Sequence, residues 1–178
     1  MSIVLENFLR YVIINSEVNV MEYHTIEPVY NENSKILILG SFPSIKSRET
    51  GFYYGHKQNR FWKVISEILD DNCPDTIDEK REFLKRHNIA LWDVIASCDI
   101  VGSTDSAIKN ETPNDIDIIL NNSNVKKIFT NGTTAYKLFC KYNKGLSAEK
   151  LPSTSPANAA FSLERLIDDW GIIKDFLN

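Results

Sequence analysis

The sequence predicts an α/β fold in which helices cover both faces of a parallel sheet. Short aliphatic runs alternate along the chain with segments in which apolar residues recur at helical spacing. Such alternation is typical of strand–helix–strand units and of parallel strand pairing. The 178 residues fit one domain, and a hydrophobic content of 43% is enough to bury a sizeable core.

The elements of the first half follow from these patterns in order. The continuous aliphatic run of Lys35–Leu39 predicts a buried strand. Apolar residues at helical spacing then predict an amphipathic helix over about Gln58–Asp70. A capping box begins a second helix at about Ile77–His87. A second strand is expected at Ile89–Ile95, and the polar stretch Ala96–Pro113 predicts a long loop.

The second half repeats the alternation. A short helix is expected over Asn114–Leu120, because an Asn stands at its start. A third strand, Val125–Thr130, precedes an Asn-Gly turn and a helix over about Thr133–Tyr142. A short fourth strand is expected at Lys150–Ser153, and the last helix spans about Leu163–Leu177.

Residues 1–25 are interpreted as an N-terminal extension and residues 26–178 as the functional domain. The apolar segment Met1–Val20 has no basic start and no small-residue cleavage site, and Glu6 and Arg10 interrupt it. It is also too short to span a bilayer. We therefore expect either a docked helix or an extension ahead of the domain, and no membrane attachment.

The cysteines and histidines argue against a metal centre. Three of each are scattered along the chain, without C-x-x-C or H-E-x-x-H spacing. Unpaired cysteines are typical of a reducing compartment, so we expect the cytoplasm of a bacterial or archaeal cell. The chain also lacks the Gly-rich dinucleotide and phosphate-loop motifs, and we expect no metal and no cofactor.

The segment Ile36–Trp62 carries the strongest functional signal. Its aliphatic run ends at Gly40, and a Ser/Pro loop leads into a cluster of aromatic and hydrogen-bonding residues. Between Lys35 and Lys63 there are six Lys or Arg and one acid, although the whole chain has a net charge of -4. A basic, aromatic-rich loop at the carboxyl end of a strand suits an enzyme that acts on a nucleic acid.

Three further loops follow predicted strands and should converge on the same sheet edge. They are Asp93–Gly102, Asn131–Gly132 and Ser153–Asn158. In the last of these, hydroxyls and backbone N–H groups precede a possible helix start, which can bind a phosphate. Taken alone, the same residues are more typical of a Ser/Pro-rich surface turn.

Four segments resemble the uracil-DNA glycosylase superfamily, and within it the branch of hypoxanthine-DNA (deoxyinosine) glycosylases. They are Leu39-Gly-Ser-Phe-Pro-Ser44, Phe52-Tyr-Tyr-Gly-His-Lys-Gln-Asn-Arg-Phe-Trp62, Leu91-Trp-Asp-Val94 and Leu151-Pro-Ser-Thr-Ser-Pro-Ala-Asn158. The resemblance covers about Ile26 to the C-terminus. It implies a three-layer α/β/α sandwich with a four-stranded parallel sheet. It also implies a monofunctional enzyme that flips a deaminated base, chiefly hypoxanthine, out of DNA and hydrolyses its N-glycosidic bond.

Two positions depart from the uracil-excising enzymes of this superfamily. Phe42 stands where the mismatch-specific enzymes carry a water-positioning Asn, and Leu151 replaces the histidine of a His-Pro-Ser motif. Both departures are shared with the hypoxanthine branch and disfavour strong uracil excision. In that branch catalysis is assigned to the asparagine of a His-x-x-Asn segment, which is Asn59 here.

The resemblance suggests two catalytic residues. Asn59 would orient the attacking water or hydrogen-bond the purine, and its structural alternative is the N-cap of the following helix. His56 would polarise the leaving purine or contact phosphate, and its alternative is a hydrogen bond that braces the loop.

The other candidates fall into two groups. For base binding, Phe42 would either stack on the flipped base or pack in the core. Asp93 would either accept the N1–H of hypoxanthine or cap the turn after its strand. The remaining base-binding candidates are Ser41, Tyr54 and Asn131. The candidate DNA-phosphate contacts are Ser44, Ser153, Ser155, Asn158 and Arg60.

We therefore expect a monomer whose partner is double- or single-stranded DNA containing a deaminated base. Two alternatives remain. One is a uracil or mismatch-specific glycosylase, which would prefer uracil-containing DNA. The other is a non-catalytic α/β module that binds DNA or a nucleotide, and it would bind a lesion without producing an abasic site.

Overall fold

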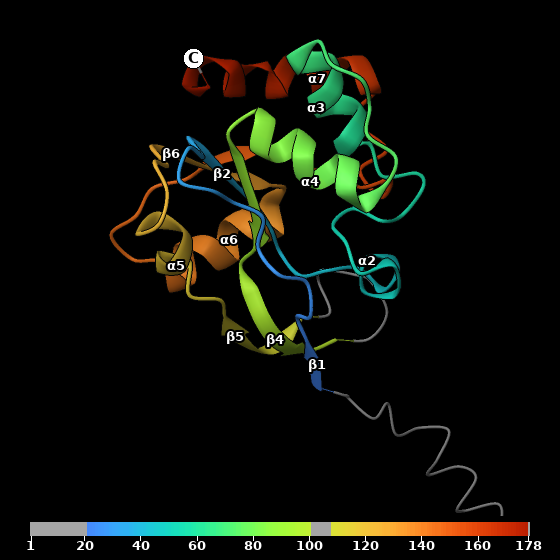
Figure 1. The fold of residues 1–178 in the computed structure, drawn as a ribbon. Helices are drawn as coiled ribbons and strands as arrows, with labels where there is room; N and C mark the ends of the chain where they lie inside the picture. The colour runs from blue at the N-terminus through green and yellow to red at the C-terminus, as the bar shows by residue number, and fades with distance from the viewer. Residues whose placement is uncertain (1–20, 101–107, 178) are drawn as a thin grey trace, which may run out of the picture.

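The computed structural model describes residues 21–100 and 108–177, and Figure 1 shows their arrangement. The predicted docked helix or extension at residues 1–20 lies outside the described residues. Four strands form a parallel sheet in the order β3-β2-β6-β7, which confirms the predicted α/β fold. They are β2 (Ile36–Gly40), β3 (Ile89–Asp93), β6 (Lys127–Asn131) and β7 (Glu149–Leu151).

The register of this sheet brings the functional loops together. Gly40 pairs with Asp93 at the carboxyl ends of β2 and β3, and Leu39 pairs with Thr130 of β6. Every residue of β2 and β3 is buried, which explains their continuous aliphatic sequences. The loops that leave these strands therefore start from a rigid edge.

Helices cover both faces of the sheet, as Figure 1 shows. On one side lie α3 (Phe61–Leu69), α4 (Ile77–Arg86) and α7 (Leu163–Trp170). On the other lie α5 (Asp117–Leu120) and α6 (Thr133–Tyr142). The predicted capping box of α4 is present, because Thr76 and Glu79 exchange hydrogen bonds.

Two helical segments differ from the predictions. The last helix ends at Trp170 and continues as the 3₁₀ helix η2 (Gly171–Phe176). A further short helix, α2 (Ile45–Thr50), occupies part of the segment expected to be a loop after β2. The Ser44 side chain begins it by accepting a hydrogen bond from the N–H of Ser47 at 3.2 Å.

The prediction of a long loop at Ala96–Pro113 is wrong in its described part. Here β4 (Ile95–Asp99) and β5 (Lys109–Pro113) pair antiparallel, and β1 (Met21–Tyr23) adds to the other edge of β4. The polar β5 forms a strand because β4 supplies partners for its backbone, which its own side chains do not reveal. Figure 1 shows this small sheet below the parallel one.

The strand β1 also bears on the proposed domain boundary. Its residues belong to the segment 1–25 interpreted as an extension, yet they pair with Ser97–Asp99. The division at residue 26 stays a prediction, and residues 21–25 contact the domain.

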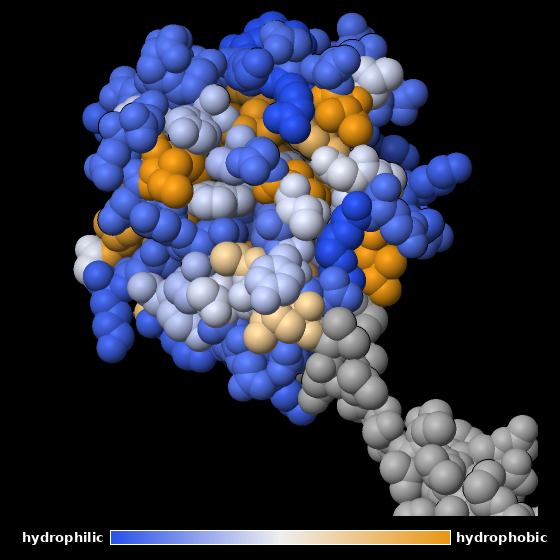
Figure 2. Space-filling view, turned by 60° about the horizontal axis from the view of Figure 1, so that its bottom comes forward, coloured by the Kyte–Doolittle hydropathy of each residue, from blue (hydrophilic) through white to orange (hydrophobic). Residues whose placement is uncertain are grey.

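Figure 2 shows one face of the molecule, on which hydrophilic residues predominate and apolar residues form separate small patches. Within residues 21–100 and 108–177, no helix combines the length and apolar character needed to cross a membrane.

Candidate active site

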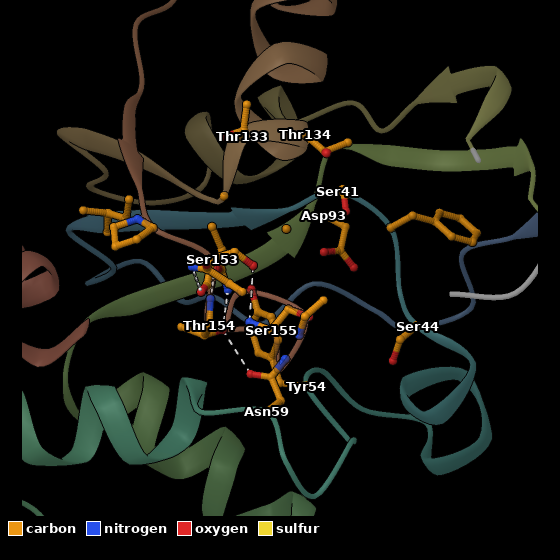
Figure 3. Close-up of a pocket in the computed structure, with 18 of the residues that line it drawn as sticks. Ser41, Ser44, Tyr54, Asn59, Asp93, Thr133, Thr134, Ser153, Thr154 and Ser155 are labelled. Atoms are coloured by element: carbon orange, nitrogen blue, oxygen red, sulfur yellow. Dashed lines mark hydrogen bonds between the residues drawn. The ribbon is translucent and has the colours of Figure 1, made fainter. Parts of the chain in front are cut away.

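A pocket of about 730 Å³ opens at the carboxyl edge of the parallel sheet. Its lining comes from the loops that follow β2, β3, β6 and β7, as expected for an open α/β sheet. Figure 3 shows side chains from these loops facing one another across it. Ten of the twelve predicted site residues line the pocket: Ser41, Phe42, Ser44, Tyr54, Asn59, Asp93, Asn131, Ser153, Ser155 and Asn158.

The other two, His56 and Arg60, are not among the residues that line it. His56 is exposed, and its Nδ1 accepts a hydrogen bond from the N–H of Gln58 at 3.2 Å. This is the loop-bracing alternative. Arg60 donates to the backbone carbonyls of Thr154, Ser155, Asn158 and Phe161. Its guanidinium therefore holds the Ser153–Asn158 loop in shape instead of facing a phosphate.

Asn59 is held by two donors at one atom. Its Oδ1 accepts hydrogen bonds from the N–H of Phe61 and from the hydroxyl of Thr154, both at 3.0 Å. A backbone N–H can only donate, so the atom it meets must be the amide oxygen. The amide nitrogen Nδ2 is then the group that Asn59 presents. Among the described residues, none accepts a hydrogen bond from it.

Asn131 fixes the direction of the same network. Its Oδ1 accepts from the N–H of Thr154 and its Nδ2 donates to the Thr154 hydroxyl, both at 2.9 Å. The hydroxyl hydrogen must therefore point to Asn59 Oδ1. Figure 3 shows this chain of contacts along one wall of the pocket. Sequence reasoning missed the fully buried Thr154 individually, although it lies inside the Leu151–Asn158 segment.

Asp93 lies on the opposite side of the pocket, in contact with His24. The Asp93 Oδ2 is 2.9 Å from the His24 Nε2, and both side chains are almost fully buried. A Cβ built on Gly40 would lie 2.0 Å from Asp93 Oδ1, so only glycine leaves room for this carboxylate. Sequence reasoning missed His24, because a single histidine 69 residues earlier in the chain gives no signal of this contact.

Aromatic residues wall the pocket near Asp93. Phe42 is buried, with its ring centroid 6.1 Å from that of His24 and 5.5 Å from the Arg48 guanidinium carbon. Tyr54 stacks on Phe61 at 4.0 Å between centroids. Burial, with a smaller contribution from the charge of Asp93, raises the pKa of the Tyr53 hydroxyl, which therefore stays a donor.

The predicted phosphate-contacting serines make hydrogen bonds within their own loops. The Ser153 hydroxyl accepts from the N–H of Ser155 at 3.2 Å, and the Ser155 hydroxyl accepts from the N–H of Ala157 at 3.3 Å. Asn158 donates to the carbonyl of Ser153 at 2.9 Å. Gly132, at a φ of +97°, lets the next loop come close, since its Cβ would lie 2.9 Å from that of Ser153.

The basic residues around the first loop are mostly used inside the fold. Lys35 donates to the carbonyl of Leu177, Lys46 pairs with Glu49, and Arg48 donates to the carbonyl of Pro43. Arg60 is also engaged, so the exposed cations of this segment are Lys57, Lys63 and the surface-paired Lys46. The local charge of the sequence therefore overstates the positive surface available to DNA.

Over the described residues there is no group of three or more His, Cys, Asp or Glu side chains that could hold a metal ion. The groups that the residues of the pocket offer include a neutral amide donor, a buried carboxylate and aromatic walls.

Comparison with known proteins places this geometry in a family. Residues 27–173 match the model of the uracil DNA glycosylase superfamily. A hypoxanthine DNA glycosylase of Methanosarcina acetivorans is 37% identical over 141 residues, which cover 77% of this chain and 89% of the relative. A hypoxanthine DNA glycosylase of Methanosarcina barkeri is 37% identical over 114 residues, covering 63% of this chain and 72% of the relative.

A solved structure agrees with these matches. The solution structure of a Methanosarcina acetivorans protein, provisionally named a uracil DNA glycosylase, superimposes with a TM-score of 0.73 at 32% identity. The match covers 86% of this chain and 96% of that one. The chain belongs to the uracil DNA glycosylase superfamily.

Proposed function

We propose that this protein is a monofunctional hypoxanthine-DNA glycosylase that releases hypoxanthine from deoxyinosine in DNA by hydrolysis. The observation that carries the proposal is the pocket itself, in which an amide donor and a buried carboxylate face each other at the edge of the sheet. The two hypoxanthine DNA glycosylases that match most of the chain support the same lesion.

The proposed reaction begins with extrusion of the lesion from the duplex into the pocket, where an aromatic wall that includes Phe42 would contact it. Cleavage of the C–N bond leaves negative charge on the departing purine and positive charge on the sugar. A fixed donor near the purine stabilises the transition state more than the ground state. Water then adds to the sugar carbon, the proton that it loses neutralises the departing purine, and an abasic site and free hypoxanthine remain.

The hydrogen-bond directions refine the role of Asn59. Its Oδ1 already accepts from Phe61 and Thr154, so it has little capacity to accept a hydrogen bond from the attacking water. The Nδ2 can instead donate to the leaving purine. We therefore assign Asn59 to leaving-group stabilisation. His56 is left out of the chemistry, because it is exposed and lies outside the pocket lining.

Single-turnover assays on duplexes carrying one inosine, uracil or xanthine test the proposal, with alkali to reveal abasic sites. We expect inosine to be excised fastest, and Asn59→Ala to lower that rate about 10²- to 10³-fold, the usual effect of removing one fixed donor. Gln58→Ala is the matched control, because Gln58 is exposed, adjacent and outside the pocket lining.

Asn59→Asp distinguishes the two roles of this residue. The variant keeps the size of the side chain and its acceptor oxygen but lacks the N–H donor. Activity as low as that of Asn59→Ala supports leaving-group stabilisation, whereas activity near wild type would point to water activation. Preferential excision of uracil would assign the protein to the uracil-excising enzymes instead. The absence of an abasic product from every lesion tested would contradict the proposed enzymatic activity.

A further inference from the structure

The contact between His24 and Asp93 has a direction that the hydrogen bonds determine. His24 Nδ1 accepts a hydrogen bond from the N–H of Ile26 at 3.2 Å, so this nitrogen carries a lone pair. The proton of the neutral ring is then on Nε2, which donates to Asp93 Oδ2 at 2.9 Å. The Oδ2 oxygen of Asp93 thus accepts a hydrogen bond from within the protein.

The second oxygen faces the ligand side. Asp93 Oδ1 lies against Gly40, whose missing side chain provides the space, and both residues line the pocket. Figure 3 shows the Asp93 carboxyl group pointing into the cavity beside Ser41. Since the His24 and Asp93 side chains are 2% and 6% exposed, bulk water does not compete for the buried contact.

The segment that carries His24 is tied down on several sides. The His24 N–H donates to the carbonyl of Ala96 at 2.7 Å, and β1, which ends just before it, pairs with β4. The Tyr53 hydroxyl donates to the carbonyls of Ile26 at 3.2 Å and Glu27 at 3.0 Å. The histidine ring also contacts the rings of Phe42 and Trp92. Its orientation is therefore set by the fold before any ligand binds.

A carboxylate fixed in this way accepts hydrogen bonds and does not donate them. Deamination changes the bases in a way that such a group can read. Adenine presents a ring nitrogen with a lone pair at N1, whereas hypoxanthine presents N1–H beside a carbonyl. Cytosine and uracil differ in the same sense at N3. At this ring position adenine and cytosine place a lone pair, which repels the carboxylate and leaves only their neighbouring amino group to donate to it, whereas a deaminated base places a donor there.

We propose that His24 is a positioning residue that holds Asp93 as an acceptor-only reader of the ring N–H created by deamination. The site would thus favour bases with an –NH–C(=O)– edge over adenine and cytosine, which present a lone pair at that ring position. Guanine and thymine already carry a ring N–H beside a carbonyl, so the proposal concerns adenine and cytosine, the two bases in which deamination creates one. This proposal rests on the proposed function for its substrate class. It adds His24 to the site and a rule for how the site distinguishes bases.

The test compares two purines that differ at this edge. Duplexes carry either inosine or nebularine, which is the same purine without the N1–H and the 6-oxygen, each also in a 2′-fluoroarabino form that resists cleavage. Excision rates are measured on the two duplexes with the ordinary sugar, and dissociation constants on the two cleavage-resistant duplexes. His24→Phe removes both ring nitrogens but keeps an aromatic ring, and His24→Gln restores an N–H donor.

We expect wild type to prefer inosine in both assays. His24→Phe should weaken inosine binding and excision about tenfold and leave nebularine nearly unchanged, so the preference collapses, and His24→Gln should restore most of it. If His24 had a purely structural role, His24→Phe would weaken binding and excision of both purines equally, and that result would overturn the proposal. So would a wild type that binds the two cleavage-resistant duplexes with equal affinity.

Asp93→Asn provides a second route should His24→Phe fail to fold. An amide can turn its N–H group toward the purine, so this variant should gain nebularine binding relative to inosine. An unchanged preference in Asp93→Asn would overturn the proposal. The binding assay also separates the two claims: selective inosine binding without an abasic product contradicts the proposed function but supports the reading by Asp93.

Discussion

Two contacts between a histidine and an aspartate show how the surroundings of such a pair decide its role. His24 and Asp93 meet at 2.9 Å with side chains 2% and 6% exposed, at the edge of the pocket. His87 and Asp71 meet at 2.7 Å with side chains 20% and 22% exposed, beside the end of α4. The functional groups are the same, and the surroundings differ.

The outer pair is satisfied within the protein. Asp71 Oδ2 accepts from His87 and Arg86, and Oδ1 accepts from the N–H of Asn72. These donors, with His87 first, lower the pKa of the Asp71 carboxyl. Both of its oxygens are occupied, so the pair joins the turn after α3 to the end of α4. The inner pair has a donor on one side and a cavity on the other, which is the arrangement of a binding group.

The largest expected effect comes from disturbing the inner pair at Gly40. In Gly40→Ala the new Cβ would lie 2.0 Å from Asp93 Oδ1, so the carboxylate must move. A displacement of about 1 Å in an active site typically costs about 10²-fold in rate, and we expect a loss of at least that size in single-turnover excision of inosine.

Gly171→Ala is the matched control for this change. Among the described residues, and apart from its chain neighbours and the backbone of its own helix, no atom lies within 4 Å of a Cβ at that position, and its φ of -53° suits any residue. This variant should excise inosine at the wild-type rate and melt at an equal or slightly higher temperature. If Gly40→Ala were as active as Gly171→Ala, the assignment of Asp93 to the site would be wrong.

A smaller effect, on stability alone, is expected from the outer pair. Asp71→Asn removes the charge that Arg86 and His87 share, and should lower the Tm at neutral pH without changing inosine excision. Asp70→Asn is the neighbouring control, because Asp70 ends α3 in the left-handed conformation at a φ of 51°, which Asn tolerates as well. Loss of excision in Asp71→Asn with an unchanged Tm would contradict this division of roles.

Burial and sheet topology decided how much of the fold could be predicted from the sequence. The parallel strands were predictable because full burial produces continuous aliphatic runs, as in Ile36–Leu39. The convergence of ten candidate residues on one pocket followed from the parallel topology. The strand β5 was not predictable, because its sequence Lys-Asn-Glu-Thr-Pro is polar and its partner strand, with the Asn110–Asp99 side-chain hydrogen bond that accompanies the pairing, is set by the fold.

The partners within the site were beyond prediction for a related reason. Arg60 stands beside the pocket motif, but its targets are carbonyls 94 to 101 residues later in the chain. The direction of the Asn59 amide depends on Thr154 and Asn131, which approach it only in the folded protein. His24 reaches Asp93 because β1 pairs with β4, a contact between distant segments that no local pattern encodes.

The finest distinction between the two pairs lies in the acid range. The pKa of Asp71 is lowered in the folded protein, so the unfolded chain binds a proton first as the pH falls. The stabilisation by Asp71 is therefore fully present above its ordinary pKa of 3.8 and is lost as the pH falls from there toward the lower folded value. The difference in Tm between wild type and Asp71→Asn should narrow as the pH falls from 4 to 3, with part of it remaining at pH 3. Glu79, Glu111 and Glu164 also have lowered pKa values, and their contributions are expected to cancel in the difference in Tm because the substitution leaves their hydrogen-bond partners unchanged. A difference that grows toward low pH would mean that Asp71 is not stabilised as an anion, and the outer pair would then need another explanation.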